Sequence, residues 1–374
     1  MTSINPEKLF VNKKSVGSFL HKQIKKAHPN IEEEIISTNT RLDNEKYNLI
    51  SIDPKKRGLQ KRKFLGLLHR NSLWKLDPNG RSTDFLPSNM IGYGCRFNCS
   101  YCYVDRRDPA TFPKLYDDAL DIIGLIKHTM LNIKDSEELF YKVTNKKVER
   151  KRDSKHSNYI TFDLGCDSDC VLDNQITYNN EYPGHIIDII NNVAEIPEAM
   201  ISFATKSASI DNFIKYVKKP EMTRIRLSLM PEHHRSVLEM NTSKIEDRLQ
   251  AINKLVAAGF EVHINLSPIV ITANFAAEYA DLLKLVNDSL SDSAKKQMAY
   301  EIIFLTHSAS LFGKTPEYAP KAHDMMVNGP LKLVPKWNKP NVLSYDKASK
   351  DQLKIIMNSL IEEFTPYSRI RYMF

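Results

Sequence analysis

Three cysteines that lie close together carry the clearest chemical signal in the sequence. Cys95, Cys99 and Cys102 fall in the stretch GCRFNCSYCYVD, whereas the whole 374-residue chain has only five cysteines. Cysteine thiolates bind zinc and iron–sulfur clusters. An iron–sulfur cube has four irons and normally takes four thiolates, so three thiolates leave one iron open to an exchangeable ligand. We therefore predict a 4Fe–4S cluster held by these three residues.

A structural zinc site is the main alternative. Zinc usually takes four ligands in two close pairs, and no second pair follows these cysteines nearby. Cys166 or Cys170 would have to supply the fourth ligand, because His128 falls in a predicted helix. In that case the chain would be a zinc-stabilised nucleic-acid-binding protein without catalytic activity.

Short β-rich runs alternate with amphipathic helical patterns from about residue 84 onward. Six runs are candidate strands: residues 85–91, 159–164, 200–205, 223–229, 260–266 and 299–305. The clearest helix is predicted over residues 243–259. There Ser243 and Glu246 have the spacing of a capping box, and Gly259 provides a stop.

Six strand–helix units favour an α/β fold, a partial (β/α)6 TIM-type barrel, over a flat doubly wound sheet. In either architecture, loops at the carboxyl ends of the strands carry the chemistry. The cysteine stretch follows the first candidate strand and is expected in such a loop. We divide the chain into a basic N-terminal region (1–80), the barrel (81–310) and a C-terminal hairpin and helix region (311–374).

The formal net charge is +8, which predicts attraction to polyanions such as nucleic acid, although a lysine-rich face also keeps proteins soluble. Basic residues concentrate in two runs, 55–63 and 145–157; the second is interpreted as a surface insertion. The first residues lack the apolar core of a signal peptide, and no apolar run is long enough for a membrane span. Together with the odd number of cysteines, this predicts a cytoplasmic protein without a membrane partner.

The motif CxxxCxxC, with an aromatic residue before its last cysteine, resembles that of the radical S-adenosylmethionine superfamily. Later segments resemble the spore photoproduct lyase family within it. These segments are FDLGCDSD (162–169), FATKSASIDNFI (203–214), RIRLSLMPE (224–232) and EDRLQAINKLVAAGFEVHINLSPI (246–269). The resemblance covers about residues 85–310 and the last thirty or so, whereas residues 1–80 match little.

The resemblance implies a DNA repair lyase that reverses a methylene-bridged thymine dimer, the spore photoproduct, through a 5′-deoxyadenosyl radical. Its cofactors would be the 4Fe–4S cluster and S-adenosylmethionine. The residues expected to contact the polar groups of S-adenosylmethionine are Ser168, Asp169, Lys206 and Ser228. A radical enzyme that modifies another base or nucleoside is the alternative, since fold and cluster do not define the substrate.

The resemblance also assigns hydrogen-transfer roles. Cys166 would donate a hydrogen atom to the thymine-derived radical, since an S–H bond is weak compared with O–H. Tyr101 and Tyr103 would then restore the thiol and exchange a hydrogen atom with deoxyadenosine, which would regenerate the cofactor; alternatively, both rings pack beside the cluster to exclude water. Cys170 is not part of the family pattern, and its role stays open.

The expected partners are DNA containing thymine lesions and an electron donor such as flavodoxin or ferredoxin. Residues 329–345 are predicted to form a β-hairpin. Lys332, Lys336, Trp337 and Lys339 would let it wedge the duplex. The alternative is an ordinary surface hairpin whose tryptophan packs on the barrel.

Overall fold

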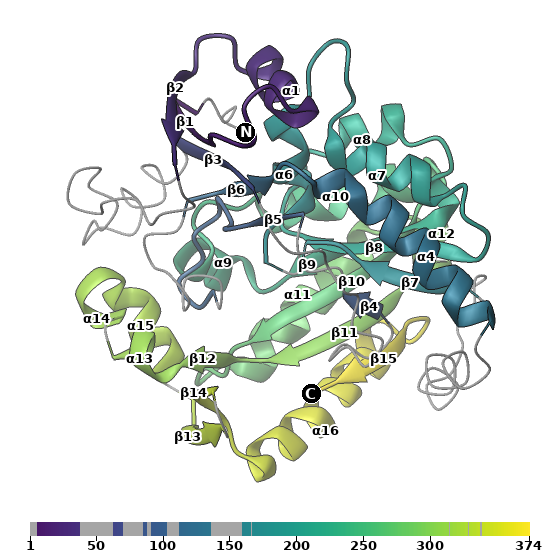
Figure 1. Cartoon of the computed structure of the whole chain (residues 1–374). Helices are drawn as coiled ribbons and strands as arrows, with labels where there is room; N and C mark the ends of the chain where they lie inside the picture. The colour runs from purple at the N-terminus through teal and green to yellow at the C-terminus, as the bar shows by residue number, and fades with distance from the viewer. Residues whose placement is uncertain are drawn as a thin grey trace.

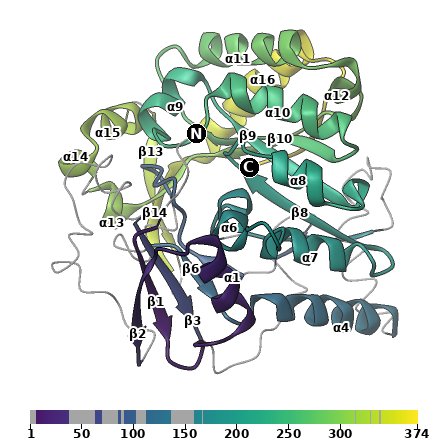
Figure 2. The ribbon, with the colours of Figure 1, turned by 90° about the horizontal axis from the view of Figure 1, so that it is seen from above.

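The computed structural model describes ten segments of the chain: 6–37, 63–69, 85–87, 91–102, 112–135, 159–165, 167–313, 315–327, 329–336 and 339–374. These residues form three sheets, of seven, five and three strands, with helices packed around them (Figures 1 and 2). Cys166, Tyr103, Trp337 and the basic run 145–157 lie outside the described residues, as does the run 55–63 apart from Lys63.

The seven-stranded sheet forms the centre of the molecule, and all of its strand pairs are parallel. Its order is β15-β11-β10-β9-β8-β7-β4. The strands are β4 (Phe85–Pro87), β7 (Ile160–Asp163), β8 (Ala199–Thr205), β9 (Thr223–Leu229), β10 (Glu261–Ile269), β11 (Ala299–Phe304) and β15 (Arg369–Met373). All six predicted strands are present, and the open, all-parallel order confirms the partial barrel. The seventh strand, β15, was not predicted.

Helices separate the strands and cover the outside of this sheet (Figure 2). They are α6 (Cys170–Thr177), α7 (His185–Val193), α8 (Asp211–Tyr216), α9 (Glu232–Leu238), α10 (Ile245–Ala257), α11 (Phe275–Ser289) and α12 (Asp292–Gln297). Every residue of β9 is buried, as expected for a parallel strand covered on both faces.

The capping box predicted for α10 is wrong. The N-cap residue is Lys244, which makes no side-chain cap hydrogen bond. The Ser243 hydroxyl accepts a hydrogen bond from the backbone N–H of Ala208 (2.9 Å) instead, and the Glu232 carboxylate accepts from the N–H of Ile245 (2.9 Å). Tertiary partners therefore replace the local cap. Gly259, at φ +95°, does end the helix as predicted.

A second sheet joins the N-terminal residues to the segment around the cysteines. Its order is β2 (Glu32–Ile36), β1 (Lys8–Asn12), β3 (Phe64–Leu68), β6 (Lys114–Tyr116) and β5 (Gly92–Tyr93). Thus the predicted strand 85–91 is only partly right: β4 ends at Pro87, and the chain enters this other sheet at Gly92. The helix α1 (Phe19–Ala27) packs against α6, and α4 (Ile122–Asp135) packs against α7 of the barrel. The helix α4 contains His128 as predicted.

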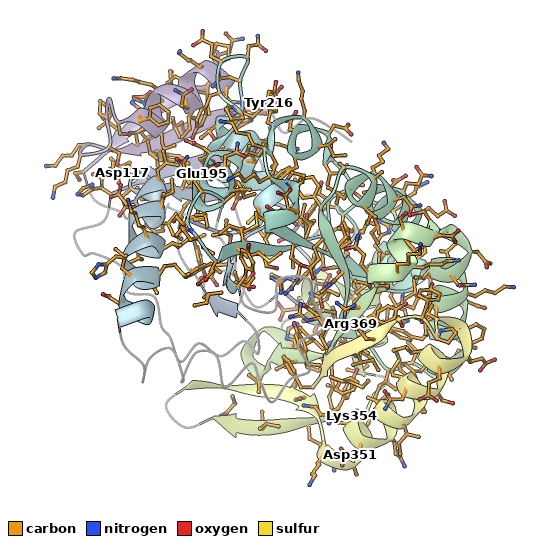
Figure 3. All side chains as sticks on the ribbon, turned by 90° about the vertical axis from the view of Figure 1, so that its right-hand side faces the viewer. Asp117, Glu195, Tyr216, Asp351, Lys354 and Arg369 are labelled. Atoms are coloured by element: carbon orange, nitrogen blue, oxygen red, sulfur yellow. The ribbon has the colours of Figure 1, made fainter. Side chains whose placement is uncertain are left out.

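The third sheet contains the predicted hairpin. It consists of β12 (Thr306–Ser308), β14 (Lys339–Tyr345) and β13 (Leu331–Lys336), all antiparallel. The helices α13 (Ala309–Phe312), α14 (Thr315–Tyr318) and α15 (Pro320–Val327) precede the hairpin, and α16 (Lys347–Phe364) follows it. The exposed face of α16 carries Lys354 and Asp351, which lie 3.8 Å apart (Figure 3), together with the exposed Ile355.

No helix in the described part of the chain combines the length and apolar character needed to cross a bilayer.

Candidate active site

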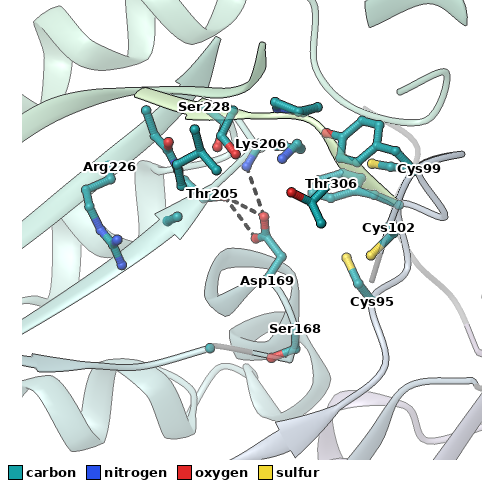
Figure 4. A pocket seen from close by; sticks show the side chains of 18 of the residues that line it. Cys95, Cys99, Cys102, Ser168, Asp169, Thr205, Lys206, Arg226, Ser228 and Thr306 are labelled. Atoms are coloured by element: carbon teal, nitrogen blue, oxygen red, sulfur yellow. Dashed lines mark hydrogen bonds between the residues drawn. The ribbon is translucent and has the colours of Figure 1, made fainter. Parts of the chain in front are cut away.

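A cavity of about 520 Å³ lies at the carboxyl ends of the central strands, where a parallel barrel presents its loops (Figure 4). Cys95, Cys99 and Cys102 gather at one end of it, and Arg226 lies at the other. The predicted residues Tyr101, Ser168, Asp169, Lys206 and Ser228 also line it. The structure therefore brings predicted residues from four separate segments to one cavity.

Hydrogen bonds from the rest of the barrel hold the cysteine loop in place. The N–H of Gly94 donates to the carbonyl of Asp167 (3.0 Å), and the N–H of Ser100 donates to the carbonyl of Leu238 (2.9 Å). Gly94 has φ +93°, a conformation that glycine adopts without strain. The loop is thus tied to the loop after β7 on one side and to α9 on the other.

The three cysteines of the loop form no disulfide with any described residue. Burial raises the pKa of the Cys95 and Cys99 thiols, and the nearby Asp169 raises that of Cys95 further. Metal ligation requires thiolates, so loading these sulfurs releases protons. Three soft sulfur donors at one end of a cavity suit an iron–sulfur cluster or zinc.

A fourth sulfur ligand is missing from the described residues that line the cavity, and so is a histidine. Cys170 is fully buried in α6 outside the cavity lining. Its sulfur packs against Gly165, where an added Cβ would lie 2.6 Å from it. Cys170 therefore does not complete a zinc site with the three cysteines of the loop.

Asp169 organises the wall next to the cysteines. Its carboxylate caps α6 by accepting from the N–H of Val171 (3.1 Å) and Leu172 (3.3 Å). It also accepts from the Thr205 hydroxyl (2.9 Å) and the N–H of Lys206 (3.0 Å), as the dashed lines in Figure 4 show. The end of β8 is thereby fixed to the start of α6.

Glu239, directly after α9, is a buried carboxylate beside the lining residues Tyr101 and Lys206. It accepts a hydrogen bond from the Tyr101 hydroxyl, lies 2.9 Å from Nη2 of Arg248 and lies 3.4 Å from Nζ of Lys206. Burial opposes its charge, but the two cations hold the pKa of Glu239 below its ordinary value. In turn, burial disfavours the charged form of Lys206, but Glu239 raises the Lys206 pKa above its usual range.

Polar side chains continue along the barrel interior. Arg226 pairs with Asp163 and lies 3.3 Å from Glu301. Asn265, on β10, lines the cavity with a buried side-chain oxygen to which no described residue donates a hydrogen bond. A polar ligand in the cavity can supply that missing donor.

Sequence reasoning missed Glu239, Arg248, Arg226 and Asn265. The available signals were polar residues in apolar patterns: Arg248 falls on the apolar face of α10, and Asn265 interrupts an apolar strand. Nothing local marks Glu239, since its partners come from three other segments.

Proteins of one family resemble this chain. A family model described as spore photoproduct lyase matches residues 4–374. The spore photoproduct lyase of Bacillus subtilis is 21% identical over 281 residues, which are 75% of this chain and 73% of that protein. The one of Clostridium acetobutylicum is 28% identical over 122 residues, 33% of this chain and 35% of that protein.

Two solved structures share the fold. A spore photoproduct lyase complexed with dinucleoside spore photoproduct has a TM-score of 0.78 at 17% identity, covering 100% of both chains. A spore photoproduct lyase variant with bound AdoMet and dinucleoside spore photoproduct has a TM-score of 0.74 at 17% identity, also covering 100% of both chains. Since the family model spans nearly the whole sequence, this chain belongs to the spore photoproduct lyase family.

Proposed function

We propose that this chain is a radical S-adenosylmethionine lyase that repairs the methylene-bridged thymine dimer in DNA. The observation that carries the proposal is the convergence of three cysteines on a cavity at the barrel mouth that also has polar lining residues. The described lining residues include no fourth sulfur ligand. Family membership supports the substrate, and the two related structures contain the dinucleoside spore photoproduct.

Cys95, Cys99 and Cys102 would hold a 4Fe–4S cluster, and its open iron would bind S-adenosylmethionine. When bound, this pair supplies a hydrogen-abstracting radical after one-electron reduction. Lys206 presents its ammonium group to the cavity, where it can pair with a carboxylate of the cofactor. The lining residues Ser168 and Ser228 offer hydroxyl groups to the cofactor.

Asp169 is already occupied by hydrogen bonds within the protein. Both of its carboxylate oxygens already accept hydrogen bonds from protein donors. We therefore assign it chiefly to positioning: it holds the backbone of Lys206 and the start of α6 in the geometry that the cofactor would meet.

Cys166 would deliver the hydrogen atom that completes repair. Its neighbour Gly165 lines the cavity, which supports access of this thiol to a bound thymine. Tyr101 lines the cavity beside the cysteines and donates its hydroxyl hydrogen bond to Glu239. We propose that Tyr101, with Tyr103, restores the Cys166 thiol by giving a hydrogen atom to its sulfur radical, and that the tyrosine recovers a hydrogen atom from 5′-deoxyadenosine.

DNA binding would use the positive net charge and the β13–β14 hairpin. Extruding the lesion from the duplex costs a few kcal/mol, less at a damaged, unstacked site. A flavodoxin or ferredoxin would reduce the cluster. A cytoplasmic location would fit the described cysteines, which form no disulfide with one another.

Anaerobic reconstitution with iron and sulfide tests the cofactor part of the proposal. We expect a chain that binds iron through the three cysteines and cleaves S-adenosylmethionine when reduced. A chain that binds zinc but no iron–sulfur cluster, and leaves the cofactor intact, would overturn it.

The dinucleoside spore photoproduct tests the substrate part. We expect the reconstituted enzyme to release the repaired dinucleotide. Cofactor cleavage without repair would instead favour modification of another base. Cys166→Ala should still cleave the cofactor but give aberrant thymine products, while the control Cys170→Ala, which also removes one thiol, should give the normal product.

A further inference from the structure

A compact group of metal-binding side chains lies outside the cavity described above. His233 and His234 belong to α9, and Glu278 belongs to α11; the two helices lie side by side (Figures 1 and 2). Nε2 of His233 is 2.9 Å from Oε1 of Glu278, and Nε2 of His234 is 3.1 Å from Oε2. One ligand atom from each residue lies within 4.8 Å of the other two.

The surrounding residues hold two of the three side chains in place. The ring of His234 is fully buried and lies 6.1 Å from that of Tyr279. The Thr272 hydroxyl donates to Oε2 of Glu278 (2.5 Å), so the carboxylate has a fixed orientation. The His233 side chain is 52% exposed, which leaves a path from solvent to the group.

The donor set is two imidazole nitrogens and one carboxylate oxygen. This combination suits zinc and other divalent transition metals, whereas magnesium and calcium prefer oxygen ligands alone. A neutral imidazole is the form that binds metals.

We propose that His233, His234 and Glu278 form a binding site for a divalent transition-metal ion, with zinc as the most suitable ion. Metal binding moves the ring proton of a neutral imidazole from Nε2 to Nδ1, without net proton release. In the described structure, Nδ1 of His234 is buried and has no hydrogen-bond partner. The loss of such a hydrogen-bond partner for a ligating histidine typically weakens metal binding about 10- to 100-fold, so we expect micromolar rather than nanomolar affinity.

The position of the site gives the ion a structural role. It would join α9 to α11 across two neighbouring strand–helix units. The carbonyl of Leu238, at the end of α9, accepts from the N–H of Ser100 in the cysteine loop. Zinc would thus stabilise the support of the cysteine loop while staying outside the reaction. This inference does not depend on the proposed function.

Zinc titration of the full-length, iron–sulfur-reconstituted protein tests the site, because the cluster then occupies the three cysteines of the loop. Zinc and iron are measured together by mass spectrometry after desalting, and affinity is measured by competition with a chromogenic indicator. The variants are His233→Ala and Glu278→Gln. The matched control is His128→Ala, which removes an exposed histidine from another helix.

We expect the wild-type protein and His128→Ala to bind about one zinc ion per chain, with unchanged iron content and a higher thermal midpoint. His233→Ala and Glu278→Gln should bind zinc at least about tenfold more weakly and lose the thermal shift. No zinc uptake by wild type at about 10 μM, or equal uptake by wild type and both variants, would overturn the proposal. If zinc instead binds at the three cysteines in place of iron, the iron content would fall, and His233→Ala would take up as much zinc as the wild-type protein. That result would also overturn the proposal.

Discussion

Replacing Glu239 by glutamine removes a buried negative charge next to the lining residues Tyr101 and Lys206 at almost constant volume. Glu239 and Arg248 are 1% and 0% exposed at their side chains, and their closest atoms are 2.9 Å apart. Lys206, 3.4 Å from the same carboxylate, loses its anion as well. The variant therefore leaves a buried guanidinium without a charged partner.

Breaking a buried ion pair from one side typically costs about 3–5 kcal/mol. Arg248 keeps two backbone acceptors, the carbonyls of Ser228 (2.6 Å) and Ser243 (3.0 Å), which compensate part of its charge. We therefore expect Glu239→Gln to lower the free energy of unfolding by about 3 kcal/mol, the lower end of this range. Arg248→Met should cost a similar amount, because it leaves Glu239 buried with Lys206 as its remaining cation.

Urea unfolding of the anaerobically reconstituted protein measures these costs, provided that the variants share one m-value. The double variant Glu239→Gln/Arg248→Met removes both charges, so its cost should fall short of the sum by at least about 1 kcal/mol. The control is Glu195→Gln, the same substitution in a 2.8 Å pair with Lys219 at the surface. Its cost should stay below about 1 kcal/mol. The reasoning fails if Glu239→Gln costs no more than the control, or if the two single costs add.

Three further predictions concern pH and packing. Burial lowers the pKa of His185 to about 3, so the unfolded chain binds more protons below pH 6.5 and stability falls as the pH decreases. His185→Asn removes the titrating ring but keeps an acceptor for the Thr177 hydroxyl. Urea unfolding should show that the free energy of unfolding decreases between pH 7 and pH 5 by about 2 kcal/mol less in this variant than in the wild-type protein. An equal decrease in both proteins would contradict this prediction. Gly165→Ala places a Cβ 2.6 Å from the Cys170 sulfur at a residue with φ +71°, so it should lower the thermal midpoint. Adding Cys170→Ala should restore part of this loss, because it relieves the close contact but leaves the backbone strain. Because burial raises the pKa of the Cys95 and Cys99 thiols, iron retention against a chelator should fall from pH 8 to pH 6; retention independent of pH would contradict that reasoning.

The barrel could be predicted because its signals are local. Each long central strand is an almost uninterrupted buried run, and the cysteine spacing needs only eight consecutive residues. The N-terminal sheet gives no such signal, since its strands are two to five residues long and pair with distant partners, such as Lys8 with Glu32 and with Phe64. Its formation depends on tertiary contacts that periodicity does not report.

The strand β15 escaped prediction for a different reason. None of its five residues is fully buried, so its sequence RIRYM lacks the apolar pattern of an inner strand. Its place in the barrel depends on buried charge: Arg371 lies 3.2 Å from Glu301, and the Tyr372 hydroxyl donates to the same carboxylate (2.6 Å). Such pairings join residues about seventy positions apart, beyond the reach of any local pattern.

The cysteine loop depends on α9 in two independent ways. Leu238 accepts the hydrogen bond from Ser100 in the loop, and Glu239, the next residue, accepts from Tyr101 between the second and third cysteines. The Glu239–Arg248 pair fixes the carboxyl end of α9, and the proposed zinc site would fix its amino end to α11. The ion pair and the zinc site both hold the same short helix. When one of them is lost, the position of α9 depends more strongly on the other. Zinc should therefore protect iron retention more strongly in Glu239→Gln than in the wild-type protein.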